Sequence, residues 1–267
     1  MGEARPTHPH TPPSAGRGFA AFLEALAGRR PALFLDYDGT LTPIVDRPER
    51  ARIDDATRAA VARLAVLCPL AVVSGRDLDD VAGMVGLEEL VYAGSHGFDI
   101  RGPGLRTQIG LEYAPALERA DAALRQRLAA VPGALVERKR FAIAVHTRLV
   151  EPAAKPAVAA AVLAAAAGEA DLRVTGGKEI HELRPNLPWD KGRAVLALID
   201  ALGLGSAVPV YIGDDETDED AFRALAGRGI GIRVMDRPDD TAAAWSLGDP
   251  AEVRVFLERL AGALEGR

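Results

Sequence analysis

A short apolar run that ends in polar residues recurs along this chain and constrains its fold more than any other feature. The runs cover residues 32–35, 70–73, 90–93 and 208–212. Stretches with helical spacing of apolar residues, 55–67, 78–85 and 194–202, precede three of these runs. Alternation of this kind predicts an α/β fold, in which a mostly parallel sheet carries helices on both faces.

Polar clusters follow each of the four predicted strands, at residues 36–40, 74–76, 94–97 and 213–215. The carboxyl ends of neighbouring parallel strands lie at one edge of a sheet, and ligands of such sheets bind beyond that edge. We therefore expect the four clusters to face one ligand site.

Residues 105–185 have a different pattern. Two helical stretches, 116–130 and 156–167, stand beside two segments of hairpin character, 135–147 and 172–184. Helices beside antiparallel hairpins favour a small inserted α+β domain, which leaves 19–104 and 186–267 for the parallel-sheet domain. Gly176-Gly177 is a natural turn for the second hairpin.

Composition excludes several classes of protein. The 267 residues include 32 Lys and Arg against 38 Asp and Glu, a net charge of −6 that argues against nucleic acid as a partner. No apolar run reaches the ~18 residues of a membrane span. The single cysteine, Cys68, fits a reducing compartment. We expect a cytoplasmic protein without membrane partners, in which the Pro- and Gly-rich residues 1–18 form a loose tail.

Asp36 and Asp38 are the first candidate functional pair. Residues two apart at the end of a strand project the same way, and two adjacent carboxylates repel each other unless a cation or a proton relieves the charge. Mg²⁺ is well suited to relieve this repulsion, because it prefers oxygen ligands and often binds phosphate at the same time. The alternative interpretation is that Asp-Gly serves only as a turn.

The second candidate is the acidic segment 213–220. A helix that begins there would favour acidic residues in its first turn, which accounts for Asp218, Glu219 and Asp220. It accounts less well for Asp214 and Asp215, which directly follow an apolar strand. We therefore predict a metal role for Asp214 and a supporting role for Asp215 and Asp218.

Two further features suit an anion. Lys191 stands at the start of a predicted helix, where a cation opposes the helix dipole unless a bound phosphate uses both. Ser74-Gly75-Arg76 offers a hydroxyl and backbone N–H groups at a strand-to-helix turn. Taken singly, surface variation explains the position of Lys191 better than a functional role does, and an ordinary helix cap is the commoner explanation of Ser74-Gly75-Arg76.

Together, the four features resemble the motifs of the haloacid dehalogenase superfamily of phosphatases, which has a Rossmann-like core. The resemblance implies that Asp36 is the nucleophile and Asp38 the general acid/base. It also implies that Thr40, Ser74, Gly75 and Arg76 bind phosphate and that Lys191 steadies phosphate and nucleophile. Mg²⁺ would lie between Asp36, the backbone carbonyl of Asp38, and Asp214.

Longer stretches resemble the trehalose-6-phosphate phosphatase family. They are FLDYDGTLTPI (34–44), VVSGR (72–76), GSHG (94–97), VERKRFAIAVHTR (136–148), GKEIHELRP (177–185), WDKG (189–192) and YIGDDETDEDAF (211–222). In that family an inserted cap domain binds the disaccharide. The matching residues here are Glu137, Lys139, Arg148, Lys178 and Glu182.

The alternation of side chains along a strand offers an independent test of whether these cap residues can face one ligand. Lys178, Glu182 and Arg184 share one parity and would lie on one face of a strand, which favours a binding face. The alternative is an ordinary solvated face. Glu137 and Lys139 have the opposite parity to His146 and Arg148. One straight strand therefore cannot direct all four side chains to one ligand. The sequence therefore predicts a turn near Lys139-Arg140.

The resemblance implies Mg²⁺-dependent hydrolysis of trehalose 6-phosphate to trehalose and phosphate through an aspartyl-phosphate. A functional pairing with a trehalose-6-phosphate synthase would fit that reaction. Two alternatives stay open: another sugar-phosphate phosphatase or phosphomutase with the same core, and a non-catalytic module that binds a sugar phosphate.

Overall fold

The structure, a computed structural model, describes residues 11–177 and 179–266 and divides into two units. The inserted unit is Gln108–Pro188, and the core unit consists of the chain on both sides of it. The sequence predicts the insertion at 105–185, so each boundary differs by three residues. The first differs because the strand Leu105–Gln108 belongs to the core sheet, and the boundary between the units falls at its last residue.

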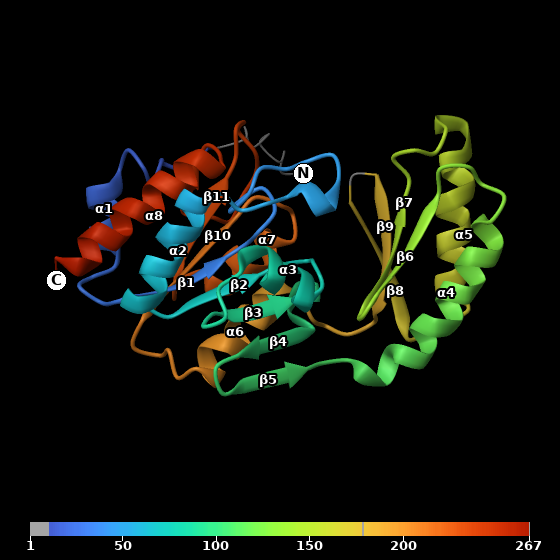
Figure 1. The fold of residues 1–267 in the computed structure, drawn as a ribbon, viewed down its shortest axis with the longest axis horizontal. Coiled ribbons are helices and arrows are strands. Elements are labelled where there is room, and N and C mark those ends of the chain that lie inside the picture. Colours follow the sequence, from blue (N-terminus) through green and yellow to red (C-terminus); the bar gives the residue numbers. More distant parts are fainter. Residues whose placement is uncertain (1–10, 178, 267) are drawn as a thin grey trace, which may run out of the picture. The chain divides into compact units, whose positions relative to one another are not determined.

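The core unit is built on an eight-stranded sheet in the order β12-β11-β10-β1-β2-β3-β4-β5 (Figure 1). Neighbours from β12 to β3 are parallel, and β4 is antiparallel to β3. The strands are β1 (Pro31–Leu35), β2 (Leu70–Val73), β3 (Val91–Gly94), β4 (Asp99–Gly102), β5 (Leu105–Gln108), β10 (Val208–Gly213), β11 (Ile230–Val234) and β12 (Trp245–Leu247).

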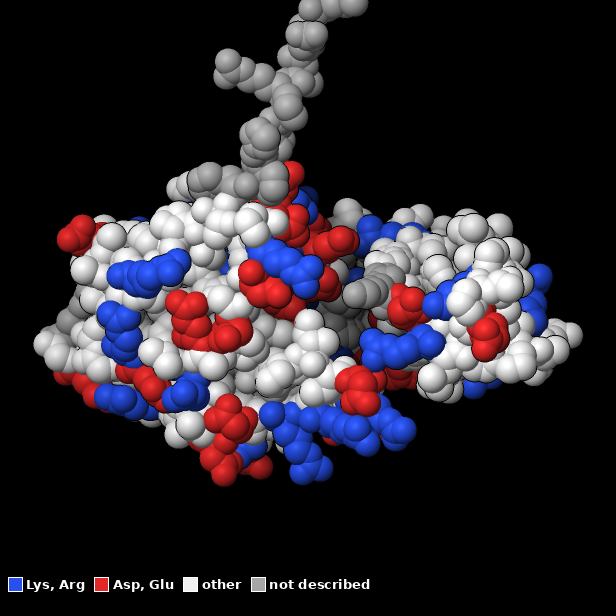
Figure 2. Space-filling view, turned by 90° about the horizontal axis from the view of Figure 1, so that it is seen from above, with Lys and Arg blue, Asp and Glu red and all other residues white. Residues whose placement is uncertain are grey.

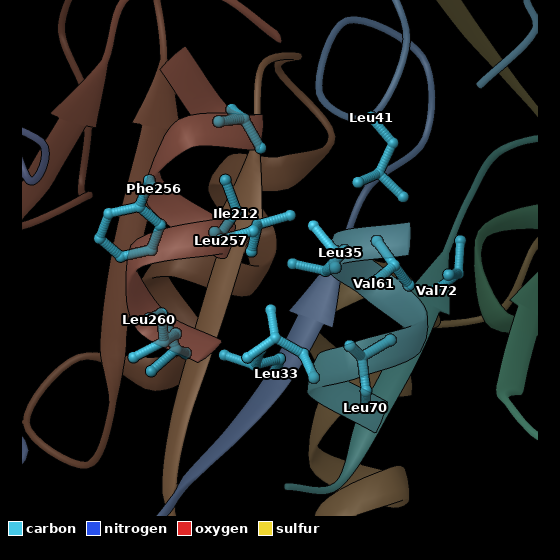
Figure 3. Close-up of a cluster of buried hydrophobic side chains, with 14 of the residues drawn as sticks. Leu33, Leu35, Leu41, Val61, Leu70, Val72, Ile212, Phe256, Leu257 and Leu260 are labelled. Atoms are coloured by element: carbon cyan, nitrogen blue, oxygen red, sulfur yellow. The ribbon is translucent and has the colours of Figure 1, made fainter. Parts of the chain in front are cut away.

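Helices cover both faces of this sheet. The helices of the core unit are α1 (Phe19–Ala25), α2 (Asp55–Leu67), α3 (Leu78–Val85), α6 (Lys191–Ala201), α7 (Asp218–Leu225) and α8 (Pro250–Glu265). Leu33 and Leu35 pack with α1, α2, α3 and α8, whereas Phe34 packs with α6 and α7, because successive strand residues face opposite sides. Figure 3 shows the first of these clusters. The predicted α/β architecture is confirmed.

Short 3₁₀ helices occupy several connections of the chain. They are Pro48–Arg50, Ser95–Gly97, Leu111–Tyr113 and Pro152–Ala154.

Residues 12–18 are not a loose tail, so the prediction is wrong for this part of residues 1–18. Ser14 forms a parallel bridge with Ser246 of β12, and the Ala15 N–H donates to the Ser246 carbonyl at 2.9 Å. Ala15 is fully buried. The segment covers the open edge of the sheet, where unpaired backbone groups would otherwise remain. Residues 1–10 of the predicted tail lie outside the described residues.

The inserted unit packs two helices on one face of an antiparallel sheet (Figure 1). The sheet order is β6-β7-β9-β8. The elements are α4 (Ala114–Leu128), β6 (Leu135–Lys139), β7 (Ala142–His146), α5 (Lys155–Ala167), β8 (Leu172–Gly177) and β9 (Ile180–Pro185). Ile143, Val145 and Leu183 point to the helices, so the residues of opposite parity form the other face of the sheet.

Both predicted hairpins form, but the turn of the second one is not where the sequence predicts it. Lys139 pairs with Ala142, so the turn predicted near Lys139-Arg140 is confirmed. Gly176 and Gly177 instead lie within β8 and pair with His181 and Ile180. The prediction that Gly176-Gly177 forms the turn is therefore wrong, since the chain reverses after these glycines. Glu179, with φ of +65°, follows them.

Charged side chains of both signs are interspersed on the face of the molecule shown in Figure 2. Several form exposed ion pairs, such as Arg101 with Asp79 at 2.7 Å, which contribute little to stability individually. Within the described part of the chain, no helix combines the length and the apolar character that crossing a membrane requires.

Candidate active site

The loop after β1 brings Asp36 close to the loop after β10. Asp36 is the first residue beyond β1, and its N–H donates to the carbonyl of Ile212 at 2.9 Å. Gly39 has φ of +79°, and a Cβ at this position would lie 2.1 Å from Oδ2 of Asp214. Only glycine permits both this backbone conformation and this close approach. Because β1 and β10 are parallel neighbours, the acidic loops that follow them lie side by side.

Three carboxylates meet at this point. One oxygen each of Asp36, Asp214 and Asp218 lies within 4.8 Å of the others. The Nζ of Lys191 donates to Oδ1 of Asp36 and to Oδ1 of Asp218, both at 2.7 Å. Asp36, Asp218 and Lys191 are buried. The structure thus joins residues that are far apart in the sequence into one buried charge cluster.

The position of Lys191 follows from the local sequence. Asp190 caps α6 by accepting a hydrogen bond from the N–H of Arg193 at 2.8 Å, which leaves Lys191 as the first helical residue. A cation at a helix N-terminus opposes the helix dipole. The two carboxylates that Lys191 contacts offset this unfavourable interaction.

Asp218 and Asp215, predicted to support the site equally, have different positions. The Tyr211 hydroxyl donates to Oδ1 of Asp218 at 2.6 Å, and the N–H of Asp215 donates to its Oδ2 at 2.9 Å. Both oxygens of Asp218 are therefore engaged by the protein. Asp215 is exposed, and its carboxylate is not part of the cluster. Asp215 acts through its backbone, because its carbonyl also accepts from Arg233 at 2.7 Å.

Burial controls the protonation of the cluster. It raises the pKa of Asp36 well above its ordinary value, and Lys191 opposes this effect only in part. Burial, together with the charge of Asp218, raises the pKa of Asp214 to about 7. Burial lowers the pKa of Lys191, but Asp218 and Asp36 outweigh it, and the pKa is raised. One ammonium group thus faces three carboxylates, and the cluster has an excess of negative charge.

This excess charge fits a divalent cation. Oδ1 of Asp214 is buried and has no hydrogen-bond partner among residues 11–177 and 179–266. Oδ1 of Asp218 already accepts from Tyr211 and Lys191, and its Oδ2 accepts from the N–H of Asp215. Of the three carboxylates, those of Asp36 and Asp214 are therefore the less engaged by the protein and the better placed to bind an ion. Hard carboxylate oxygens suit such an ion.

The loop after β2 presents groups suited to a phosphate. Ser74 is buried, and its Oγ accepts from the N–H of Arg76 at 3.1 Å. A Cβ on Gly75 would lie 2.7 Å from the ring of His96, so the loop packs tightly on the 94–97 turn. Thr40 is also buried, and no partner of its hydroxyl lies in the described part of the chain.

The guanidinium of Arg76 makes three hydrogen bonds to the protein. It donates from Nε and Nη2 to the two carboxylate oxygens of Asp38, both at 2.7 Å. A third hydrogen bond runs from Nη2 to the carbonyl of Pro48 at 2.9 Å.

In the inserted unit, one sheet face carries most of the predicted sugar-binding residues. Lys139 donates to Oε1 of Glu182 at 3.3 Å, and Arg184 donates to its Oε2. Burial raises the pKa of Glu182, but Arg184 and Lys139 outweigh it and the pKa is lowered. Nε2 of His146 lies 2.7 Å from Oε2 of Glu137, because the turn between β6 and β7 brings the two strands into antiparallel register.

The remaining two predicted residues are not placed on this face. Arg148 is exposed beyond the end of β7, and Lys178 lies outside the described residues. Two alanines of β7, Ala142 and Ala144, pair with Lys139 and Glu137 and lie between the charged side chains of β6 and β9. On this face the middle strand thus contributes short methyl side chains at these two positions, between the longer charged side chains of its neighbours.

Comparison of this sequence with known proteins shows the family to which the chain belongs. Residues 34–250 match the family model described as trehalose-phosphatase. The chain is 45% identical over 277 aligned residues to a probable trehalose-phosphate phosphatase 9 of Oryza sativa subsp. japonica, which covers 93% of this chain and 74% of that protein. The chain belongs to the trehalose-phosphatase family. This membership makes it a phosphatase, and such phosphatases take a divalent metal.

Solved structures share the fold of this trehalose-phosphatase family member. The crystal structure of a trehalose-6-phosphate phosphatase related protein is 25% identical, with a TM-score of 0.78, and the match covers 88% of this chain and 100% of that one. A haloacid dehalogenase-like hydrolase from Bacteroides thetaiotaomicron shares the fold at 14% identity, with a TM-score of 0.61 over 89% of this chain and 99% of that one.

Sequence reasoning missed one residue of this phosphatase site, Tyr211. Tyr211 lies in an apolar strand, where an aromatic residue is ordinarily core, although a buried Tyr hydroxyl needs a partner. Glu219 accepts from Arg233 at 3.1 Å and from Thr241 at 2.6 Å, so it anchors the chain behind α7. Neighbouring residues of the acidic segment thus have different roles. Asp218 contacts the site residues Lys191 and Tyr211, whereas Glu219 contacts Arg233 and Thr241 outside the cluster.

Proposed function

We propose that this phosphatase hydrolyses trehalose 6-phosphate to trehalose and inorganic phosphate, with Asp36 as the nucleophile. The observation that carries the proposal is the buried contact of Asp36 with Lys191 beside Asp214. A carboxylate held against an ammonium group has a fixed direction of attack. The same ammonium group stabilises negative charge that develops on a phosphoryl group.

In the first step an oxygen of Asp36 attacks phosphorus and the bond from phosphorus to the sugar oxygen breaks. Asp38 gives its proton to that oxygen, and trehalose leaves an aspartyl-phosphate behind. In the second step Asp38 takes a proton from water, whose oxygen attacks phosphorus. The bond to Asp36 breaks, and inorganic phosphate and the free carboxylate result.

Mg²⁺ held by Asp36, Asp214 and the backbone carbonyl of Asp38 would neutralise charge on the transferring phosphoryl group. Thr40 and Ser74 supply hydroxyls toward the phosphate oxygens, and the backbone of Gly75 permits a close approach. Asp218 keeps Lys191 in place through the second hydrogen bond of the ammonium group.

The charged face of the inserted unit would bind the sugar. Glu137, Lys139 and Glu182 offer several donors and acceptors, which suits a ligand with many hydroxyls and little apolar surface. We extend this role to Arg148 and Lys178 on the family resemblance alone. The pairing with a trehalose-6-phosphate synthase, which would supply the substrate, stays a prediction.

A phosphate-release assay tests the proposal. Trehalose 6-phosphate should release phosphate in MgCl₂ and not in EDTA, and Asp36→Asn should abolish release while the thermal unfolding temperature stays measurable. Arg101→Gln removes an exposed arginine in a surface ion pair and serves as a matched control with full activity. Preference for another sugar phosphate in a parallel screen would favour a different phosphatase, and isomerised product without phosphate would favour a phosphomutase.

A further inference from the structure

Arg76 and Asp38 form the most tightly constrained ion pair at the edge of the site. Two donors of one guanidinium reach the two oxygens of one carboxylate, each at 2.7 Å. Such a bidentate pair fixes the orientation of both groups. A carboxylate that made one hydrogen bond could still rotate about its χ2 angle.

The arginine is the anchored partner of the two. Its third hydrogen bond reaches the Pro48 carbonyl at 2.9 Å, and its Cζ lies 5.6 Å from the ring centroid of Tyr37. Tyr37 is itself fully buried and donates to the Ala51 carbonyl at 2.8 Å. The Arg76 side chain is 11% exposed, whereas that of Asp38 is 40% exposed. Arg76 therefore determines where the Asp38 carboxylate points.

We propose that Arg76 is a positioning residue for Asp38, which it orients for proton transfer, rather than a ligand of the phosphoryl group. This inference rests on the proposed function, in which Asp38 transfers protons to and from the reacting oxygens. A guanidinium engaged with a carboxylate and a carbonyl has few donors left for phosphate. Lysine cannot replace it, because an ammonium group is a single point donor.

The two roles of Arg76 differ in how they depend on the leaving group. The sugar oxygen of trehalose 6-phosphate is a poor leaving group and needs a proton as it departs. The 4-nitrophenolate of 4-nitrophenyl phosphate departs without one. The ratio kcat/KM reports only the steps up to transfer of the phosphoryl group to Asp36. A positioning role affects the two substrates unequally, and a phosphate-binding role affects them equally.

The experiment compares kcat/KM of Arg76→Gln and Arg76→Lys with that of the unchanged protein on both substrates, with Arg101→Gln as the matched control. We expect both variants to lose about 100-fold on trehalose 6-phosphate, the scale of a general acid, and less than about threefold on 4-nitrophenyl phosphate. Inhibition by inorganic phosphate should change by less than about threefold as well. If Arg76→Gln does not fold, Arg76→Lys supports the same comparison.

Equal losses on the two substrates, with proportionally weaker inhibition by phosphate, would overturn the inference and make Arg76 a phosphate ligand. A double-substitution cycle adds a second test, since Arg76→Gln should have little effect in an Asp38→Asn background. Full activity of Asp38→Asn on trehalose 6-phosphate would instead refute the proposed function. The two failures are therefore distinguishable.

Discussion

Mg²⁺ should stabilise this protein more at pH 8.0 than at pH 5.5, because protons and the cation compete for Asp214. The pKa of this carboxyl lies near 7 in the folded protein against an ordinary 3.8. A raised pKa means that the folded state holds the proton more tightly than the unfolded state does. The stabilisation is complete below about pH 4 and is lost as the pH rises through 7.

The magnitude follows from the size of the shift. A difference of about three pKa units corresponds to about 4 kcal/mol of unfolding free energy lost by the metal-free protein between pH 4 and pH 8. The raised pKa of Asp36 acts in the same direction. Mg²⁺ at a hundred times its dissociation constant restores about 2.7 kcal/mol, which corresponds to about 5–10 °C in Tm for a chain of this size.

Thermal unfolding in EDTA and in MgCl₂, at pH 5.5 and at pH 8.0, measures both effects. In EDTA the Tm should be lower at pH 8.0, and the increase caused by Mg²⁺ should be larger there. Asp214→Asn is the matched control, because it keeps the shape of the side chain and removes the titrating group. An equal Mg²⁺ effect at the two pH values, or one that survives in Asp214→Asn, would refute the reasoning.

Three further substitutions test other parts of the structure. Gly39→Ala places a methyl group against Asp214 at positive φ, so phosphate release should fall by more than about 100-fold while Tm falls by only a few degrees, as a strain of ~1–2 kcal/mol implies. Tyr211→Phe removes a buried donor to Asp218 and should lower the unfolding free energy in urea by ~1.5–3 kcal/mol. Asp54→Ala removes the side-chain cap of α2 and should cost ~1 kcal/mol at pH 7. Its cost should vanish as the pH falls below about 4 in acid titrations of stability, because the hydrogen bonds of its cap hold the pKa of Asp54 below its ordinary value.

Local patterns predicted the parts of the fold that depend on neighbouring residues. Alternating strands and helices identified the parallel sheet, because apolar periodicity follows from which faces are buried. Strand parity identified the turn at Lys139-Arg140 for the same reason. The prediction of a turn at Gly176-Gly177 was wrong, because the position of a turn depends on the register of the two strands. Here the glycines pair with His181 and Ile180, and the turn follows them.

Contacts between segments far apart in the chain could not be predicted from these local patterns. Residues 12–18 looked too polar and Pro-rich to pack, yet they cover the edge of β12, which lies more than 200 residues away in the chain. Nothing in the sequence near Arg76 indicates that its guanidinium meets Asp38, since their separation of 38 residues is closed only when β1 and β2 pair.

The sequence by itself determined which chemical groups stand at the ends of the strands, and hence that acidic residues after β1 and β10 would face a common ligand. Only the tertiary structure decided how Asp214 and Asp218 divide the work, because that depends on which oxygens Lys191 and Tyr211 already occupy. Whether a segment forms a strand or a helix is encoded in the periodicity that the segment itself carries. Hydrogen-bond partners are decided by the packing of segments that meet only in the folded chain.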